Sequence, residues 1–178
     1  MNGYEYQQVR GFIYTDIQRE INLAKMSENF LGKFLLKILI KYPGGANFMA
    51  AMALLCYTEA VGRIITGNGN KPKINFLEFF EKLGPEYKSF KDSYDVYDIF
   101  RCGLAHEYYV KKNCTIYMLS RKVACGVGID KTKKYYFVVE RYFEDFKEAF
   151  DNLLGVHVKS LGLSGLVGRG SLVSVQRY

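Results

Sequence analysis

The residues best suited to chemistry are Arg101 and His106, which stand five positions apart in the stretch 101–108. An imidazole with a pKa near neutrality can move a proton to or from the attacking 2′-hydroxyl of RNA. A guanidinium can bind the phosphate and stabilise the charge that builds on its oxygens. Together they supply what RNA cleavage without a metal ion needs. We therefore predict a phosphate-handling site at these two residues.

The spacing of the pair poses a geometric problem. Five positions along a regular α-helix turn by about 140°, so Arg101 and His106 would not share one helix face. Gly103 would let the helix relax between them, or a second subunit would complete the site. The sequence leaves both solutions open.

This stretch resembles the signature of the HEPN superfamily (higher eukaryotes and prokaryotes nucleotide-binding domain), in which an Arg, four to six residues and then a His lie on a late helix of a helical bundle. The resemblance covers residues 9–113 as architecture and 101–106 as motif. It implies an up-and-down four-helix bundle, commonly a homodimer with the two Arg/His pairs facing each other across the interface. Many members are metal-independent endoribonucleases of toxin–antitoxin or phage-defence systems. Others bind RNA or nucleotides without cutting them.

The resemblance also implies roles for individual residues. His106 would be the general acid/base and Arg101 would hold the scissile phosphate, leaving a 2′,3′-cyclic phosphate and a 5′-hydroxyl. Glu59 is the best match to an acidic residue that the family often carries on an earlier helix, and Arg63 would pair with it four positions on. Separately from the resemblance, Tyr108 and Tyr109 have two interpretations: stacking on bases, or packing as aromatic residues at a helix end.

One residue departs from the family pattern. Active members usually have a polar residue directly after the Arg, and this chain has Cys102. The departure favours an alternative, in which the domain binds a nucleotide, RNA or an antitoxin-like protein without turnover. In a third and purely structural interpretation, Arg101 pairs with Asp98 or Asp95 at a helix end, and the chain is a helical dimerisation domain.

Composition limits the classes of protein further. A chain of 178 residues with 49% hydrophobic content suits one domain with a core, and a net charge of +7 suits an anionic partner such as RNA. The polar start (1–10) and the lack of a long apolar run predict a cytoplasmic protein without a membrane partner. Four scattered cysteines and two histidines lack the spacing of a zinc site, so we expect reduced thiols, no metal and no cofactor.

The elements that would position the site are mostly helical. We predict a mainly α fold, a four- or five-helix up-and-down bundle with a small antiparallel β appendage before the last helix. The helical domain would span 1–154, with the appendage near 114–139, and 155–178 would be a Gly/Ser-rich tail. The predicted elements are helices at 8–26, 30–40 and 46–66, a short helix capped by Asn75 and stopped at Gly84-Pro85, a helix from about Ser93 to Val110, strands at 115–119, 123–129 and 135–139, and a helix at 140–154 stopped by Gly155.

Overall fold

A computed structural model describes residues 3–29, 32, 34, 46–67, 69–104, 114–120 and 122–160. Over these residues the protein is mainly helical, as the sequence predicts, and a small three-stranded mixed sheet precedes the last helix. The helix predicted at 30–40 lies outside the described residues except for positions 32 and 34. In chain order the elements are α1 (Gly3–Glu28), α3 (Asn47–Thr66), α4 (Pro72–Phe80), η1 (Glu81–Leu83), α5 (Pro85–Ser93), η2 (Tyr97–Cys102), β1 (Thr115–Tyr117), β2 (Val127–Ile129), β3 (Tyr135–Val138) and α7 (Val139–Ser160).

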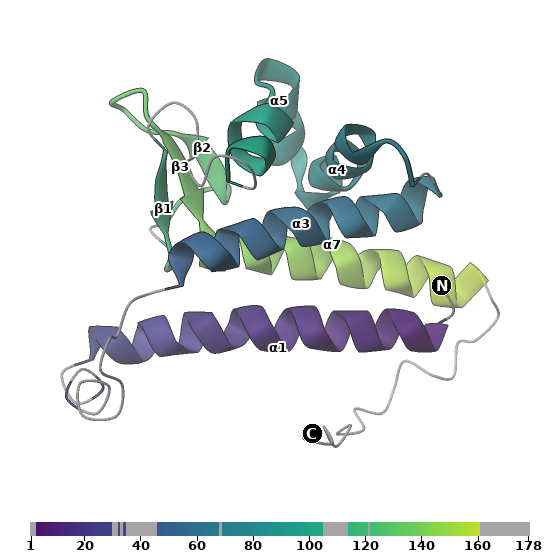
Figure 1. Cartoon of the computed structure of the whole chain (residues 1–178), viewed down its shortest axis with the longest axis horizontal. Helices are drawn as coiled ribbons and strands as arrows, with labels where there is room; N and C mark the ends of the chain where they lie inside the picture. The colour runs from purple at the N-terminus through teal and green to yellow at the C-terminus, as the bar shows by residue number, and fades with distance from the viewer. Residues whose placement is uncertain are drawn as a thin grey trace.

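Three long helices, α1, α3 and α7, lie side by side and contact one another, while α4 and α5 lie on the side of α3 away from α1 (Figure 1). The apolar face predicted for α1 is confirmed, because Ile13, Ile17 and Ile21 are each 2% exposed. Removing such side chains from water provides most of the force that holds the helices together, about 2 kcal/mol for each. The matching surface of α7 is aromatic, with Phe143, Phe146 and Phe150 all buried.

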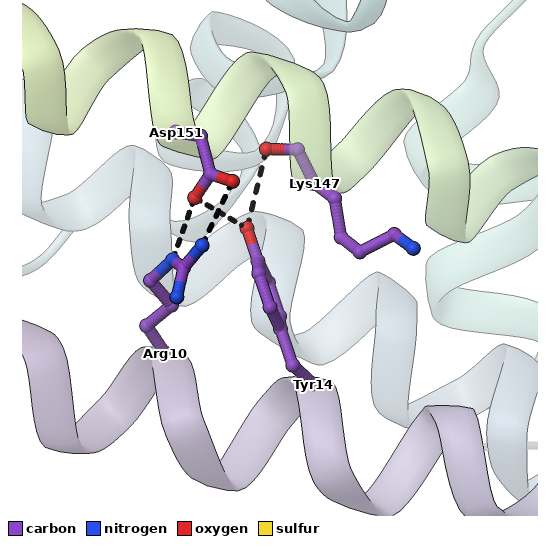
Figure 2. A network of polar contacts seen from close by, with 4 residues as sticks. All are labelled: Arg10, Tyr14, Lys147 and Asp151. Carbon is purple, nitrogen blue, oxygen red and sulfur yellow. Dashed lines mark hydrogen bonds and ion pairs between the residues drawn. The ribbon is translucent and has the colours of Figure 1, made fainter. Parts of the chain in front are cut away.

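A polar clasp also joins α1 to α7 (Figure 2). The Arg10 guanidinium donates from Nε to Asp151 Oδ1 (2.6 Å) and from Nη2 to Asp151 Oδ2 (2.9 Å). The Tyr14 hydroxyl lies 2.9 Å from Asp151 Oδ1 and 3.2 Å from the carbonyl oxygen of Lys147. Both arms of the Arg10 fork therefore hold one carboxylate in a fixed orientation.

Helix α3 is apolar because it packs on several elements at once. It contacts α1, α4 and α7, and it is the one described helix long and apolar enough to cross a membrane by length and composition. Gly62 lets α4 approach closely, since a Cβ there would collide with the carbonyl oxygen of Asn75. Gly67 ends the helix as predicted, in the left-handed conformation (φ 63°) with its N–H bonded to the Arg63 carbonyl.

The region after α3 differs from the prediction in how its helices start. Pro72, rather than an Asn75 cap, begins α4, because the fixed φ of proline suits a first helical turn. Asn75 is instead buried, and its Oδ1 accepts a hydrogen bond from Thr66 Oγ1 (2.6 Å). The Gly84-Pro85 pair ends one helix and starts another, α5, which the sequence reading missed.

The strands form a sheet in the order β1-β3-β2. The predicted antiparallel pairing holds for β2 and β3, but β1 runs parallel to β3, so a wholly antiparallel appendage was wrong. Alternation along a strand indicates which residues face the core, and it is the same for either direction of pairing. The inner face carries Val127, Tyr135 and Phe137, all buried.

A buried polar network fixes this sheet to the helices. The Tyr87 hydroxyl donates to Asp145 Oδ2 (2.6 Å) and accepts the N–H of Gly126 (2.8 Å). Arg141, one helical turn before Asp145, also pairs with that carboxylate, with 2.7 Å between Nη2 and Oδ1. Residues from α5, the start of β2 and α7 are thereby satisfied together, as buried polar groups must be.

The last helix is longer than predicted. Gly155 does not end α7, which continues to Ser160. A glycine inside a helix costs about 1 kcal/mol relative to alanine but does not stop it unless the backbone must turn there. The first residues of the predicted tail therefore belong to α7, and positions 161–178 lie outside the described residues.

Candidate functional site

The described part of the predicted site is centred on Arg101 and Glu59, while His106 and Tyr108 lie outside the described residues. Arg101 Nε donates to Glu59 Oε2 across 2.9 Å, joining η2 to α3. The two side chains are 18% and 23% exposed. Two residues of the predicted site, Arg101 and Glu59, are thus in direct contact over a separation of 42 positions.

Two expected pairings were wrong. Glu59 pairs with Arg101 and not with Arg63, which is exposed and lies toward the end of α3 near Gly69. Arg101 does not pair with Asp98 or Asp95, and the Asp95 carboxylate instead binds Lys73 Nζ at 2.6 Å. A half-buried carboxylate gains more from a half-buried cation than from a solvated one, because water screens the second interaction.

Arg101 lies on a π-turn. The segment Tyr97–Cys102 is π-helical, and the N–H of Gly103 reaches back five residues to the carbonyl of Asp98. This wider turn changes which face a residue presents, relative to a regular α-helix, and such turns are often found at functional sites. Asp95 lies just before this segment, and its carboxylate accepts the N–H of Asp98 at 3.2 Å.

Two further side chains, Cys56 and Tyr97, belong to the same site and were not predicted. Cys56 precedes Glu59 by three positions on α3, and Tyr97 precedes Arg101 by four on η2, so each lies on the same side of its helix as the charged residue. The Tyr97 ring packs edge-on against Phe76 of α4 at 5.5 Å. The helical spacing was the signal that could have identified them.

The electrostatics of the site keep Arg101 charged and the side chains of Cys56 and Tyr97 neutral. Burial opposes the charge of Arg101, but the groups on Cys56, Glu59 and Tyr97 outweigh it and raise the pKa of Arg101. Burial raises the pKa of Cys56 and that of Tyr97, with Glu59 adding to the effect in both. The described part of the site therefore offers a permanent cation at Arg101, with neutral hydrogen-bonding groups on Cys56 and Tyr97 near neutral pH.

This arrangement can bind an anion but does not by itself supply a proton-transfer group tuned to neutral pH. Among the described residues Glu59 is the acceptor that Arg101 contacts, and it takes the Nε–H. A phosphate would be met by the terminal amino groups of the guanidinium, which carry four more N–H donors. The acid/base role in the predicted chemistry therefore stays with His106.

All four cysteines are free thiols, with Cys125 buried and the others half-buried. Within the described ranges no three His, Cys, Asp or Glu side chains gather in a group that could hold a metal ion.

Comparisons with models of protein families, with curated proteins and with solved structures found no match to this chain.

Proposed function

We propose that this protein is a HEPN-like helical domain that engages RNA through Arg101 and His106, and that it cuts RNA without a metal ion. In this proposal α1, α3, η2 and α7 belong to an up-and-down bundle, and two copies of the chain face each other across their Arg/His pairs. The contact between Arg101 on a late helix and Glu59 on an earlier one supports the proposal.

The observation that carries the proposal is the state of Arg101. Its guanidinium is largely withdrawn from water, yet among the described residues it is held by one Nε contact. Withdrawal from water strengthens its attraction for a phosphate, and the single contact orients it without using the whole fork. A net charge of +7 would draw RNA toward it.

In the cleavage step His106 takes the proton from a 2′-hydroxyl, and the 2′-oxygen attacks the adjacent phosphorus. The bond from phosphorus to the 5′-oxygen breaks, and that oxygen accepts a proton from the protonated His106, which returns to its neutral form. The products are a 2′,3′-cyclic phosphate and a 5′-hydroxyl. Arg101 stabilises the charge on the non-bridging oxygens while the bonds change. Glu59 acts only as a positioning residue for Arg101.

The test is incubation of purified protein with single-stranded RNA in excess chelator, with analysis of the new ends. Wild-type protein is expected to give cyclic phosphate ends, and His106→Ala and Arg101→Ala are expected to give none. Arg10→Ala, which removes a guanidinium from the α1–α7 clasp, is the matched control and is expected to cut. If the wild-type protein leaves RNA intact, or if the ends are those of a metal-dependent nuclease, the enzyme proposal fails.

A second function, binding without turnover, is favoured by Cys102 in the position after Arg101. In that case the same site binds a nucleotide, RNA or an antitoxin-like protein. RNA binding that survives His106→Ala, weakens with added salt and produces no cleavage would support this alternative over the ribonuclease.

A further inference from the structure

The turn between β2 and β3 is a rigid, basic projection at the edge of the molecule. It protrudes beyond the helices (Figure 1). The turn carries Lys131, Lys133 and Lys134, all exposed. Its own acidic residue is Asp130, so positive charge predominates there.

Asp130 organises the turn. Its Oδ1 accepts hydrogen bonds from the N–H and the hydroxyl of Thr132 (both 2.7 Å) and from the N–H of Lys134 (3.0 Å). Backbone bonds in both directions between Asp130 and the residues 133–134 close the hairpin. The hydrogen bonds from Thr132 and Lys134 lower the pKa of Asp130, so its carboxylate stays charged and bound to the turn. The lysines are consequently displayed on a fixed frame.

The three lysines of the turn have no salt bridge to a carboxylate among the described residues, a state they share with Lys71, Lys82 and Lys88. Three other lysines are paired: Lys25 with Glu140, Lys73 with Asp95 and Lys91 with Glu81. The hairpin therefore presents three lysines against one carboxylate, that of Asp130, and an anionic polymer would supply further partners.

An aromatic residue lies on the same face of the sheet. Side chains alternate along β3, so Tyr136 points away from the buried Tyr135 and Phe137, to the side that Lys134 shares. Tyr136 is paired across the strands with Gly128, where its ring covers the space that a side chain would fill. It is half-buried, which leaves part of the ring accessible. Lysines beside an accessible aromatic ring are the combination with which single-stranded nucleic acid is bound.

We propose that the β2–β3 hairpin is an RNA-binding surface, in which Lys131, Lys133 and Lys134 contact backbone phosphates and Tyr136 stacks on a base. This inference rests on the proposed function, since it specifies how the same RNA is held outside the Arg101 site. A lipid surface is a weaker fit, because the turn from Asp130 to Lys134 has no apolar side chain that could enter a bilayer.

The experiment compares two triple variants of the full-length chain. One is Lys131→Gln, Lys133→Gln and Lys134→Gln. The matched control, Lys71→Gln, Lys82→Gln and Lys88→Gln, removes the same charge from exposed positions just before α4, on η1 and on α5. Binding to fluorescent 2′-O-methyl RNA, which lacks the attacking hydroxyl and cannot be cut, is measured by anisotropy from 50 to 200 mM salt.

The hairpin triple variant is expected to bind at least tenfold more weakly at low salt. The slope of log affinity against log salt should fall by about 2, since each lost phosphate contact on a single strand contributes about 0.7. The control triple variant should show a much smaller change in RNA affinity and in salt slope. Tyr136→Leu should weaken binding at least fivefold with an unchanged slope, because stacking carries no charge. Circular dichroism confirms that each variant is folded.

Several outcomes overturn the inference, and they are separable from failure of the proposed function. Equal losses in the two triple variants would mean that the chain attracts RNA by diffuse charge. Unchanged binding by the hairpin variant, with binding still lost in Arg101→Ala, would remove the hairpin and leave the proposed function standing. Absence of RNA binding by the wild-type chain would remove the proposed function itself. Vesicles of anionic phospholipid are the last arm, and hairpin-dependent binding to vesicles but not to RNA would identify a membrane surface instead.

Discussion

Among the described residues, two arginine–carboxylate pairs join helices, and they are built differently. Arg10 and Asp151 connect α1 to α7 through both arms of the guanidinium, with Tyr14 on the same carboxylate. Arg101 and Glu59 connect η2 to α3 through Nε alone. The second pair is nevertheless the less exposed, at 18% and 23% against 34% and 44% for the first.

The way in which each guanidinium is held distinguishes Arg10, which forms a structural pair, from Arg101, which is a candidate binding group. A fork closed on one carboxylate has its main donors satisfied and gains little from a ligand. The Arg101 guanidinium is held through Nε, is mostly shielded from water and lies on a π-turn. It is therefore oriented, and its terminal amino groups can bind a second anion. On this account Arg10 stabilises the fold and Arg101 binds RNA.

The largest expected effect is that of Arg101→Ala on cleavage. Removing a group that stabilises charge in the transition state commonly costs about 10²–10³ in rate. The midpoint of thermal unfolding should change by only a few degrees, since one part-exposed pair contributes little to stability. Single-turnover cleavage and a thermal melt of the same preparation measure both quantities. A large loss of stability with unchanged cleavage would reverse the roles assigned to the two arginines.

Glu59 should show an intermediate effect if it positions Arg101. Glu59→Ala is expected to slow cleavage about tenfold, whereas Glu59→Gln, which keeps an oxygen that can accept the Nε–H, should recover most of that loss. The comparison uses the rate at saturating RNA. Equal rates for Glu59→Gln and Glu59→Ala would show that the carboxylate charge, rather than the hydrogen bond, is what the site needs.

Arg10→Ala should affect stability and leave chemistry unchanged. The bidentate pair and its packing on Tyr14, whose ring centroid lies 4.5 Å from Arg10 Cζ, should contribute about 1 kcal/mol to the free energy of unfolding. Urea unfolding of Arg10→Ala against wild-type protein measures the difference. A double-mutant cycle with Asp151→Asn should assign most of it to the pair. Reduced cleavage by well-folded Arg10→Ala would contradict a purely structural role.

The smallest expected effect is the dependence of the clasp on pH. Burial opposes ionisation of Asp151, but the hydrogen bonds from Arg10 and Tyr14 prevail and lower its pKa below the ordinary 3.8. Its contribution is therefore present above about pH 4 and is lost as the pH falls through the folded-state value. Burial and the hydrogen bond to Asp151 raise the pKa of Tyr14 above 10. The contribution of Tyr14 to stability is therefore complete below pH 10 and is lost at higher pH.

The pH range over which Asp151 and Tyr14 stabilise the protein can be measured with two conservative variants. The difference in unfolding free energy between wild-type protein and Asp151→Asn should be constant near neutrality and shrink toward acid, by less than about 1 kcal/mol in total. The difference for Tyr14→Phe should shrink toward alkaline pH instead. A difference from Asp151→Asn that grows as the pH falls would mean that the carboxylate is not stabilised by Arg10.

The elements of this fold were predictable where one signal dominated. The apolar faces of α1 and α7 follow from helical spacing, and Gly67 ends α3 because the backbone there is left-handed. The errors occurred where two signals competed, as at Pro72 and Asn75, which both mark helix starts. Gly155 shows that the same residue type ends a helix only when a turn follows. Strand direction in the sheet depends on the path of the connecting chain, which the alternation of β1 does not encode.

The candidate site was predictable in its residue types and less so in its contacts. Arg101 and Glu59 could be named from the sequence, but their pairing depends on how η2 crosses α3. The π-turn that carries Arg101 has no signature in residue type, and Cys56 and Tyr97 join the site only through that crossing. The spacing along α3 therefore predicted Arg63 as the partner of Glu59, whereas the packing of η2 on α3 makes Arg101 its partner.

The most direct test of the account is the salt dependence of RNA binding for Arg101→Gln beside Arg10→Gln, measured on 2′-O-methyl RNA. Both variants lose one guanidinium, so their net charges are equal. The account predicts that Arg101→Gln binds more weakly and that its salt slope falls by about 0.7, one phosphate contact on a single strand, while Arg10→Gln matches the wild-type protein. Equal slopes for the two variants would contradict the assignment of Arg101 to the RNA phosphate.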